Sequence, residues 1–513
     1  MAKAFKDIAK LSMATMGSRI LGLVRDSASM AYIGLGAVSA AYTFAFTLPN
    51  LFRRLLGEGA LTSAMVPIFT QTLNEEGKEG AFGFLNKTLS RAGLIFTAIV
   101  VAGMLLALIT LHTELSQTER FELGAAYSIV LMPYMFLICM AAVFTAALNV
   151  LGSFGIPAIG PAALNIMIIL GTFTGVCVFG NNSELIAYAM CGGWLAGGFL
   201  QMAIPAVYLR KFGWRFKFDL KGSAALSELW RLFLPACAGA AVIQLNIFAS
   251  KILALFISND ALPSLYISSR MLELPLGVFA IAVATVYFPK LSSLSSSKDT
   301  QGYRREYKFG LIVTMAISVP ATLGLVTLSQ DILSTLFQWG IFGSKDVEIC
   351  TPVMVAAVMG LPFFALATFA TRGFHSTKDT KIPMRACCWS FAVNIILSLL
   401  LMFKYGAVGL ASANVGAAIL QSAYLTFYLR KKFGNFGAWG SIVKITIASI
   451  LMAISIEGGK QLTASYFDGR ELAVLNCAIF IPIGCLLYLL FLKLVEFEQL
   501  DTLLKPALKK FRK

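Results

Sequence analysis

The chain has 513 residues, of which 58% are hydrophobic and only 13% are charged, whereas soluble domains are about 25% charged. Its mean hydropathy is +0.78, and residues 123–183 contain no charged side chain. That stretch is far longer than the roughly 20 apolar residues that cross a bilayer. These values exclude a soluble domain and predict an all-α integral membrane protein.

The net charge of +16 raises the question of a nucleic-acid partner. The nine cysteines and two histidines raise the question of a metal site. The cysteines show no CxxC or Cys/His ligand spacing, so we interpret them as small apolar packing residues. The chain has no GxxxxGK[ST] loop for nucleotide phosphates. We therefore expect no metal, no cofactor and no enzymatic activity.

The N-terminal ten residues are basic, but no short apolar segment with a small-residue cleavage site follows them. No cleavable signal peptide is expected. Apolar runs between charged or turn-rich breaks predict fourteen membrane-spanning helices. In chain order they cover about residues 10–34, 38–56, 89–111, 125–151, 158–181, 185–209, 229–257, 265–288, 309–336, 350–371, 383–403, 407–429, 438–458 and 472–495.

The lysines and arginines fall unevenly between the two sides of these spans. If the N-terminus is cytoplasmic, most of the 42 basic residues lie in the termini and in the loops on the cytoplasmic side. The loops on the other side hold five, Arg120, Lys345, Lys404, Lys460 and Arg470. This bias follows the positive-inside rule and places both termini in the cytoplasm. The basic excess then faces anionic lipid headgroups, and a nucleic-acid partner is not expected.

Two dipeptides recur at the same spacing. Leu48-Pro49 returns as Leu274-Pro275, and Ile156-Pro157 returns as Ile382-Pro383, in both cases 226 residues later. Repeated halves around a central site are typical of secondary transporters. We therefore predict a first six-helix lobe over 1–215, a second over 216–432, and two further helices with a basic tail over 433–513.

Several charged residues lie inside the predicted spans, where a charge costs at least about 2.5 kcal/mol and normally faces a cavity or a partner. Arg270 and Glu273 share a helix face and either neutralise each other or line a cavity. Arg19 and Arg25 are roughly 9 Å apart along their helix, and the alternative to a shared ligand is a structural pair with Asp26. Lys251 is interpreted mainly as snorkelling to the outer interface.

Arginines outnumber acids within these spans, which indicates an anionic ligand. Guanidinium groups bind phosphate oxygens in a bidentate manner, so a phosphate or pyrophosphate headgroup is expected. A cation exporter would place Asp or Glu there instead. For Arg53 and Arg54, anchoring at the cytoplasmic interface remains an equal alternative.

Three segments resemble the MurJ/MviN family of lipid II flippases. They are residues 18–26 (SRILGLVRD), residues 45–60 (AFTLPNLFRRLLGEGA) and residues 270–278 (RMLELPLGV). The stretch 148–165 is also similar, and the resemblance runs from about residue 10 to 430. It implies the fold of the multidrug/oligosaccharidyl-lipid/polysaccharide exporters, with two six-helix lobes around a central cavity, plus two C-terminal helices that form a groove for the undecaprenyl tail.

The resemblance also implies a function. The chain would flip lipid II, the undecaprenyl-pyrophosphate-linked peptidoglycan precursor, across a bacterial inner membrane by alternating access. Its partners would be lipid II, membrane lipids and other cell-wall synthesis proteins. The implied substrate-binding residues are Ser18, Arg19, Arg25, Asn50, Arg53, Arg270 and Glu273, and the implied structural residues of the cavity are Asp26, Pro49, Glu58 and Pro275.

The sequence departs from the family at two positions. Ala40 stands where relatives usually carry an acid, and Ser269 stands where they often have Asp. Any gating or coupling role of the acid at the position of Ala40 therefore cannot be assigned to this chain. Three other functions stay open: export of another undecaprenyl-linked glycan, such as an O-antigen or capsule unit, cation-coupled drug export on the same fold, and a non-transporting membrane scaffold.

Overall fold

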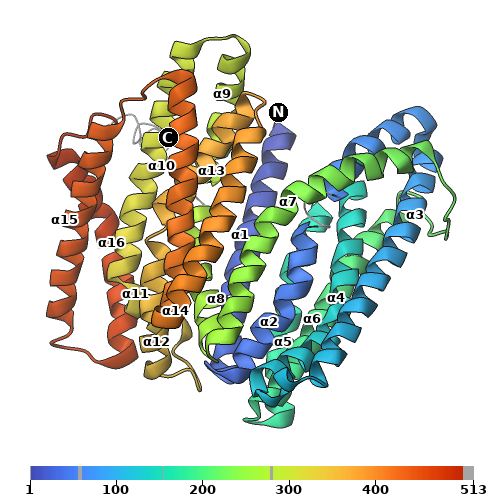
Figure 1. The fold of residues 1–513 in the computed structure, drawn as a ribbon, viewed down its shortest axis with the longest axis horizontal. Helices are drawn as coiled ribbons and strands as arrows, with labels where there is room; N and C mark the ends of the chain where they lie inside the picture. The colour runs from blue at the N-terminus through green and yellow to red at the C-terminus, as the bar shows by residue number, and fades with distance from the viewer. Residues whose placement is uncertain (1, 56–60, 154, 278–280, 501–513) are drawn as a thin grey trace. The chain divides into compact units, whose positions relative to one another are not determined.

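A computed structural model of the chain describes residues 2–55, 61–153, 155–277 and 281–500. Those residues form helices and their connections (Figure 1). The first helices in chain order are α1 (Ala2–Ile33), α2 (Ala37–Phe52), α3 (Thr62–Leu111), the short 3-10 helix η2 (Glu114–Gln117), α4 (Glu119–Val150), α5 (Gly155–Phe179), α6 (Ser183–Arg210) and α7 (Ala224–Ile257). The remaining helices are α8 (Ala261–Pro275), α9 (Ile281–Ser296), α10 (Thr300–Thr327), α11 (Ser329–Phe337), α12 (Ser344–Val358), α13 (Leu361–Ser376), α14 (Lys381–Phe433), α15 (Trp439–Thr463) and α16 (Gly469–Leu494). The all-α membrane prediction is confirmed.

The residue ranges of α3 and α14 each contain two helical arms joined by a sharp turn. In α14, Gly406 has φ 54°, in the left-handed region that favours glycine. The Ser390 hydroxyl donates to the carbonyl of Ala417 at 3.3 Å, although 27 residues of straight helix would hold them about 40 Å apart. In α3, Gly77 has φ 70°, and Leu61 and Ala92 on either side of it line one pocket. Both helices therefore turn back at these glycines.

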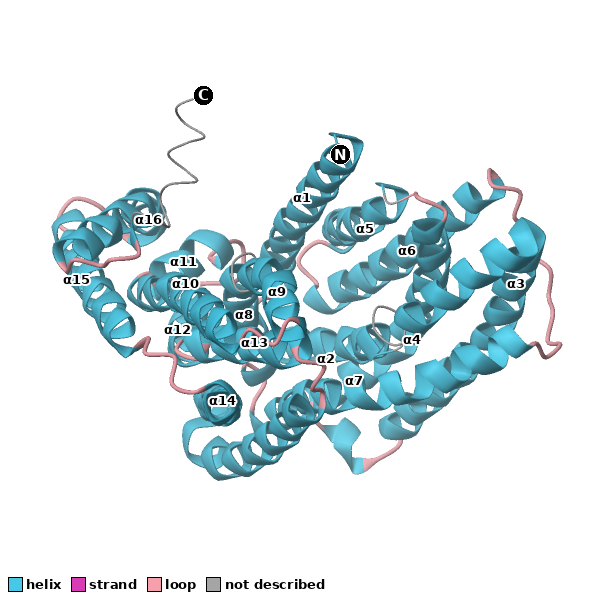
Figure 2. Cartoon of the chain, turned by 90° about the horizontal axis from the view of Figure 1, so that it is seen from above, coloured by secondary structure: helices cyan, strands magenta, loops and turns pink. Residues whose placement is uncertain are grey.

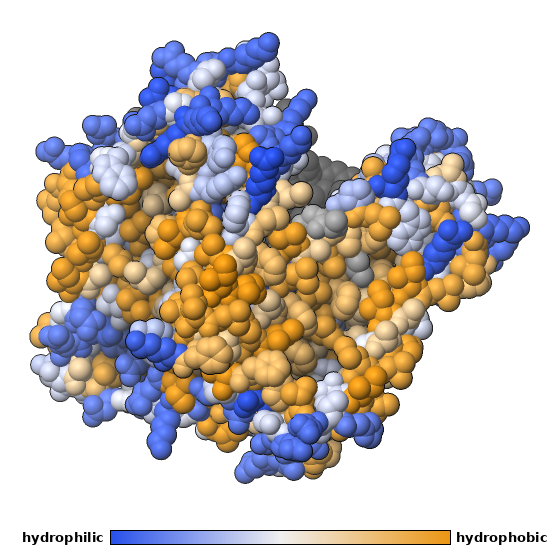
Figure 3. Space-filling model, in the orientation of Figure 1, coloured by the Kyte–Doolittle hydropathy of each residue, from blue (hydrophilic) through white to orange (hydrophobic). Residues whose placement is uncertain are grey.

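Nine helices in the described part of the chain are long and apolar enough to cross a membrane. This set treats α12 and α13 as one span and each hairpin as one helix. The predicted number of fourteen spans therefore stays a prediction. On the face in Figure 3, hydrophobic residues form a band between hydrophilic ends, as expected for spanning helices.

The chain divides into two compact units. The first contains Met1–Pro263 and Trp339–Gly343, and the second contains Ser264–Gln338 and Ser344–Lys513. The first unit thus includes α1 to α7, and the second includes α9 to α16 with most of α8 (Figures 1 and 2). The lobes predicted over 1–215 and 216–432 concern an internal repeat, and they remain a proposal.

The helix boundaries repeat with the spacing of the proline dipeptides. Pro157 and Pro383 are each the third residue of their helix, α5 and the first arm of α14, where a missing amide proton costs no helical hydrogen bond. When 226 is added to its residue numbers, α4 coincides with α12 and α13, and α6 coincides with the second arm of α14. In the same way, α1 falls on α7 and α2 on α8. This agreement supports the two-repeat proposal.

In the first unit, α5 and α6 pack with their backbones close together. A Cβ added at Gly193 would lie 2.6 Å from the carbonyl oxygen of Met167, and one added at Gly197 would lie 2.9 Å from the Cα of Leu164. Small residues at helix contacts are typical of membrane proteins, where close packing replaces the hydrophobic effect. This contact fixes the positions of Asn165 on α5 and Trp194 on α6.

In the second unit, buried aromatic rings join α10, α13 and α14. Tyr307 lies 5.0 Å from Phe369 between ring centroids, and Tyr303 stacks on Phe433 at 4.0 Å. The Tyr303 hydroxyl donates to the carbonyl of Gly373 at 2.8 Å, which gives the buried polar group its partner. A polar cluster joins α11, α15 and α16: Lys460 lies 2.9 Å from Asp331, and the Asn476 amide donates to Asp331 at 2.8 Å.

Candidate substrate site

Arg25 and Asp26 form a buried ion pair on α1. They are 7% and 4% exposed, and the Arg25 Nε and Nη2 donate to the same Asp26 oxygen at 3.0 and 2.6 Å. A buried guanidinium needs a counter-charge because desolvation is costly. The structural pairing that the sequence left as an alternative is therefore present, whereas anion binding by Arg25 stays a prediction.

Side chains from α5 and α6 complete the surroundings of this pair. The Arg25 Nη1 donates to the Asn165 side-chain oxygen at 3.0 Å, and the Asn165 amide donates to the carbonyl of Ser18 at 3.0 Å. The Arg25 guanidinium lies 5.5 Å from the Trp194 ring centroid, within the range of a cation–π contact. Trp194 in turn donates to the Tyr42 hydroxyl at 2.8 Å. Ser18 thus takes part through its backbone.

Arg19, one turn and a half before Arg25, has a different environment. Its side chain is exposed, and it makes no hydrogen bond or ion pair to any part of the chain that the structure describes. If α1 spans the membrane as the sequence predicts, the Arg19 guanidinium must meet water or an anion, because lipid tails offer neither. Of the two arginines of α1 that are predicted to bind the headgroup, Arg25 is paired with Asp26, whereas the Arg19 guanidinium is exposed and can bind an anion.

On α2, the predicted residues lie around the helix end. Arg53 Nε donates to the Asn50 side-chain oxygen at 3.0 Å, and the Asn50 amide donates to the carbonyl of Phe46 at 3.0 Å. Pro49 is buried within the helix, and Arg54 is exposed. Asn50 and Arg53 therefore form a local pair, while Glu58 lies outside the described residues. Ala40, at the position of the missing acid, is 0% exposed.

In the second unit, Arg270 and Glu273 form the predicted pair on α8. The Arg270 Nη1 donates to Glu273 at 3.1 Å, and Nη2 donates to the Tyr266 hydroxyl at 2.8 Å. The side chains of Arg270 and Glu273 remain 32% and 45% exposed, so both can still meet a ligand. Pro275 is the last residue of α8, and Ser269 is exposed.

Lys251 on α7 contacts α2, and its snorkelling to the outer interface stays a prediction. It is half-buried and its ammonium donates to the Thr47 hydroxyl on α2 at 3.1 Å. With the repeat spacing of 226, Lys251 is the counterpart of Arg25. If the proposed repeat holds, each repeat carries a cation at this position of its first helix.

Sequence reasoning did not assign a role to Asn165, Trp194 or Tyr266. Asn165 is an amide in an apolar span and could have been found by extending the search for costly groups from charged to polar residues. Trp194 and Tyr266 gave no such signal, because aromatic residues are common in spanning helices. No group of three or more His, Cys, Asp or Glu suited to a metal occurs among the residues that the structure describes.

Comparison with known proteins decides the family. Residues 30–482 match the family described as "Lipid II flippase MurJ". The chain belongs to the MurJ family. Among MurJ relatives, a probable lipid II flippase of Vibrio cholerae is 32% identical over 438 residues, covering 81% of each chain. Another from Bdellovibrio bacteriovorus is 29% identical and covers 98% of this chain and 97% of the relative.

Solved structures agree with the MurJ assignment. One described as a lipid II flippase MurJ in an inward closed conformation is 27% identical, with a TM-score of 0.78 over 97% of this chain and 99% of that one. An inward-facing multidrug MATE transporter of the MOP superfamily is 14% identical with a TM-score of 0.68, over 84% and 98% of the two chains. The second likeness shows the shared exporter fold alone. As a MurJ-family transporter, the chain is not an enzyme.

Proposed function

We propose that this protein moves lipid II from the inner to the outer leaflet of the bacterial cytoplasmic membrane. The observation that carries the proposal is the match to the MurJ family over residues 30–482. Lipid II carries a pyrophosphate between its lipid tail and its sugars, and a polar headgroup of this kind cannot cross the hydrocarbon core unaided. The protein supplies a polar path and performs no bond chemistry.

The intramembrane arginines are the groups that suit the pyrophosphate. Arg19 offers an exposed guanidinium on α1, and Arg270 is partly exposed beside Glu273. Arg25 is buried against Asp26, so its binding to an anion would require that carboxylate to yield its place or to share it. We propose that Arg19 and Arg270 bind the pyrophosphate, and that Arg25 joins them as Asp26 and Asn165 rearrange.

We further propose the orientation of the chain, with both termini in the cytoplasm. The basis is the distribution of basic residues, which concentrates lysine and arginine at one end of the spans. In this orientation the basic connector at 211–223 and the basic C-terminal tail lie at the cytoplasmic surface. Lipid II is made there, so its anionic headgroup would approach a basic rim.

Depletion of the protein in its own bacterium tests the substrate. We expect lipid II to accumulate in the inner leaflet, because its export is the step that is lost. A different undecaprenyl-linked glycan accumulating while external lipid II stays normal would contradict the proposal. That result would favour the glycan exporter, since both substrates carry a pyrophosphate.

A further inference from the structure

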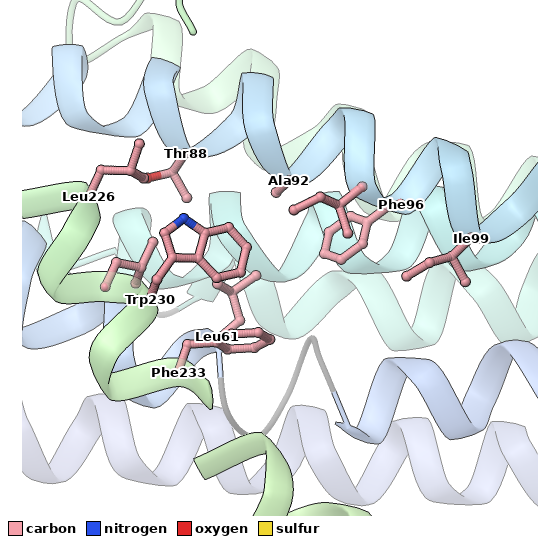
Figure 4. Close-up of a pocket in the computed structure, with 10 residues that line it drawn as sticks. Leu61, Thr88, Ala92, Phe96, Ile99, Leu226, Trp230 and Phe233 are labelled. Carbon is pink, nitrogen blue, oxygen red and sulfur yellow. The ribbon is translucent and has the colours of Figure 1, made fainter. Parts of the chain in front are cut away.

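An apolar pocket lies between α3 and α7 in the first unit, away from Arg19 and Arg25. It has about 440 Å³ of empty space, counting its open mouth. Figure 4 shows the Trp230 ring projecting from α7 into the space beside α3. The side chains around it are apolar apart from one hydroxyl and one indole nitrogen: Leu61, Thr88, Ala92, Ile95, Phe96, Ile99, Leu226, Leu229, Trp230 and Phe233.

The pocket opens on a surface that suits contact with lipid. Ile95, which lines it, is 41% exposed, and its neighbour Leu94 is 52% exposed. Further along the same arm, Leu105 and Leu106 are 54% and 65% exposed. Exposed apolar side chains on a spanning helix face acyl chains, because water is absent at that depth. An apolar molecule already in the membrane can therefore reach the pocket.

A basic rim adjoins the pocket where the α6–α7 connector crosses α3. The Arg91 Nη2 donates to the carbonyl of Leu220 at 2.8 Å, and the amide of Asp219 donates to the Ser90 hydroxyl at 3.0 Å. These contacts hold the connector against the turn of α3 that carries Thr88 and Ala92 of the pocket. The rim comprises five cations and one acid, Lys87, Arg91, Arg215, Lys217, Lys221 and Asp219.

The described residues provide the rim lysines with no ion-pair partner. Within the described residues, Lys87, Lys217 and Lys221 form no ion pair. Glu228, in the first turns of α7, lies 3.8 Å from Arg231. The rim therefore keeps a positive surplus, and each basic residue near a membrane surface attracts anionic lipid by about 1 kcal/mol.

Trp230 supplies a polar group to the pocket lining, and its indole nitrogen lies on the side of Thr88 (Figure 4). It is half-buried, and its indole N–H makes no hydrogen bond to the described part of the chain. Tryptophan is common at the membrane interface because its ring is apolar and its N–H seeks a partner at headgroup level. Thr88 donates its hydroxyl proton to the carbonyl of Phe84 at 2.9 Å, so its oxygen can only accept here.

We propose that the groove between α3 and α7 binds one anionic phospholipid. Its acyl chain occupies the apolar pocket, its phosphate lies at the rim of Lys87, Arg91 and Lys221, and its ester oxygens accept from the Trp230 N–H. The bound lipid fills the space between α3 and α7 and makes their contact depend on membrane composition. This site is separate from the transport arginines, and it does not rest on the identity of the transported molecule.

Quenching of tryptophan fluorescence by brominated acyl chains tests the site directly. The full-length protein is reconstituted in phosphatidylcholine bilayers with increasing amounts of brominated phosphatidylglycerol. The fluorescence of Trp230 alone is obtained by subtracting the fluorescence of Trp230→Phe from that of the wild type. Trp389→Phe isolates, in the same way, a comparison tryptophan on α14 that is 59% exposed and does not line the pocket. We expect Trp230 to reach half-maximal quenching at about tenfold less brominated lipid than Trp389.

The rim is tested by Lys87→Glu/Lys221→Glu, with Lys431→Glu as the control at an exposed lysine of α14. We expect the double variant to remove the preference of Trp230 for the anionic lipid, and the control to keep it. Equal quenching of Trp230 and Trp389 at every lipid content would overturn the proposal. So would reversal of Trp230 quenching by undecaprenyl phosphate and not by unbrominated phosphatidylglycerol, which would assign the pocket to an isoprenoid tail.

Discussion

Arg25 and Asp26 are buried neighbours on α1, so each can be removed alone or with the other. Breaking a buried ion pair by removing one member costs about 3–5 kcal/mol, because the remaining charge has no partner. We expect Arg25→Ala to lower the thermal unfolding midpoint of the purified protein and to abolish lipid II export. The double variant Arg25→Ala/Asp26→Ala should recover much of the midpoint and none of the export.

This pair of measurements separates structure from function. If the only role of Arg25 is to balance Asp26, the double variant restores stability and export together. Export by the double variant at the wild-type level would therefore remove Arg25 from the proposed pyrophosphate site. Complementation of a depleted strain measures export, with membrane abundance determined in the same cells.

Arg19 is exposed and makes no contact with the described residues that its removal would break. Surface substitutions of this kind change stability by less than about 0.5 kcal/mol. We expect Arg19→Ala to leave the unfolding midpoint unchanged and to abolish export. Arg19→Lys should restore export in part, because a single ammonium cannot bind a phosphate in a bidentate manner. Normal export by Arg19→Ala would exclude this arginine from the site.

At the scale of elements, α15 and α16 are tied to α11 by one polar cluster. Lys460 on α15 lies 2.9 Å from Asp331 and donates to the carbonyl of Thr327 at 2.8 Å. Asn476 on α16 donates to the other Asp331 oxygen and accepts from the Thr463 hydroxyl at 2.7 Å. Asp331 is thus the common partner of both C-terminal helices.

Removing either charge of this cluster should loosen both helices. We expect Asp331→Ala and Lys460→Ala each to destabilise the protein by up to about 3 kcal/mol, somewhat below the value for a fully buried pair. The exchange Asp331→Lys/Lys460→Asp should recover part of that loss, because it restores opposite charges. Thermal unfolding in detergent provides the measurement. Single variants as stable as the wild type would show that the cluster does not hold α15 and α16.

The whole molecule shows which levels of structure the sequence could predict. The apolar runs were long enough to predict an all-α membrane protein, and the 226-residue spacing of two proline pairs matches the spacing of the helices. The turn of α14 at Gly406 was predicted, since the apolar spans 383–403 and 407–429 are separated there. The first arm of α3, before Gly77, was not predicted as a helix, and the predicted single spans 309–336 and 350–371 are each divided, into α10 and α11 and into α12 and α13. Hydropathy reports burial in lipid, not the direction of the backbone.

The candidate site could be predicted as a set of residues but not as a geometry. Charges in apolar spans stand out because they are costly, which identified Arg19, Arg25 and Arg270. The ion pairs of Arg25 with Asp26 and of Arg270 with Glu273 are local and were among the predicted alternatives. The contacts of Arg25 with Asn165 and Trp194, which are 140 and 169 residues away, were not predicted. Contacts at that separation follow from helix packing, here the close approach of α5 and α6, and no local pattern encodes them.

The proposed orientation makes a prediction for the whole chain. Single cysteines placed at Lys217, Lys298 and Lys431 should react with membrane-impermeant reagents only from the cytoplasm, because these lysines belong to the basic side. Cysteines at Glu114, Asn182 and Asp468 should react from outside in intact cells. The native cysteines are first replaced by serine or alanine, and export by that background is the control. External labelling at Lys217 would reverse the orientation.

The central claim is that this chain alone carries lipid II across a bilayer, and reconstitution tests it most directly. Vesicles containing the purified protein and fluorescent lipid II are treated with an impermeant reagent that destroys exposed fluorophores. We expect lipid II from the inner leaflet to become accessible with the wild type and to stay protected with Arg19→Ala. A second undecaprenyl-pyrophosphate-linked glycan should stay protected with both. Equal protection of lipid II by the wild type and Arg19→Ala, or faster movement of the second glycan, would contradict the account.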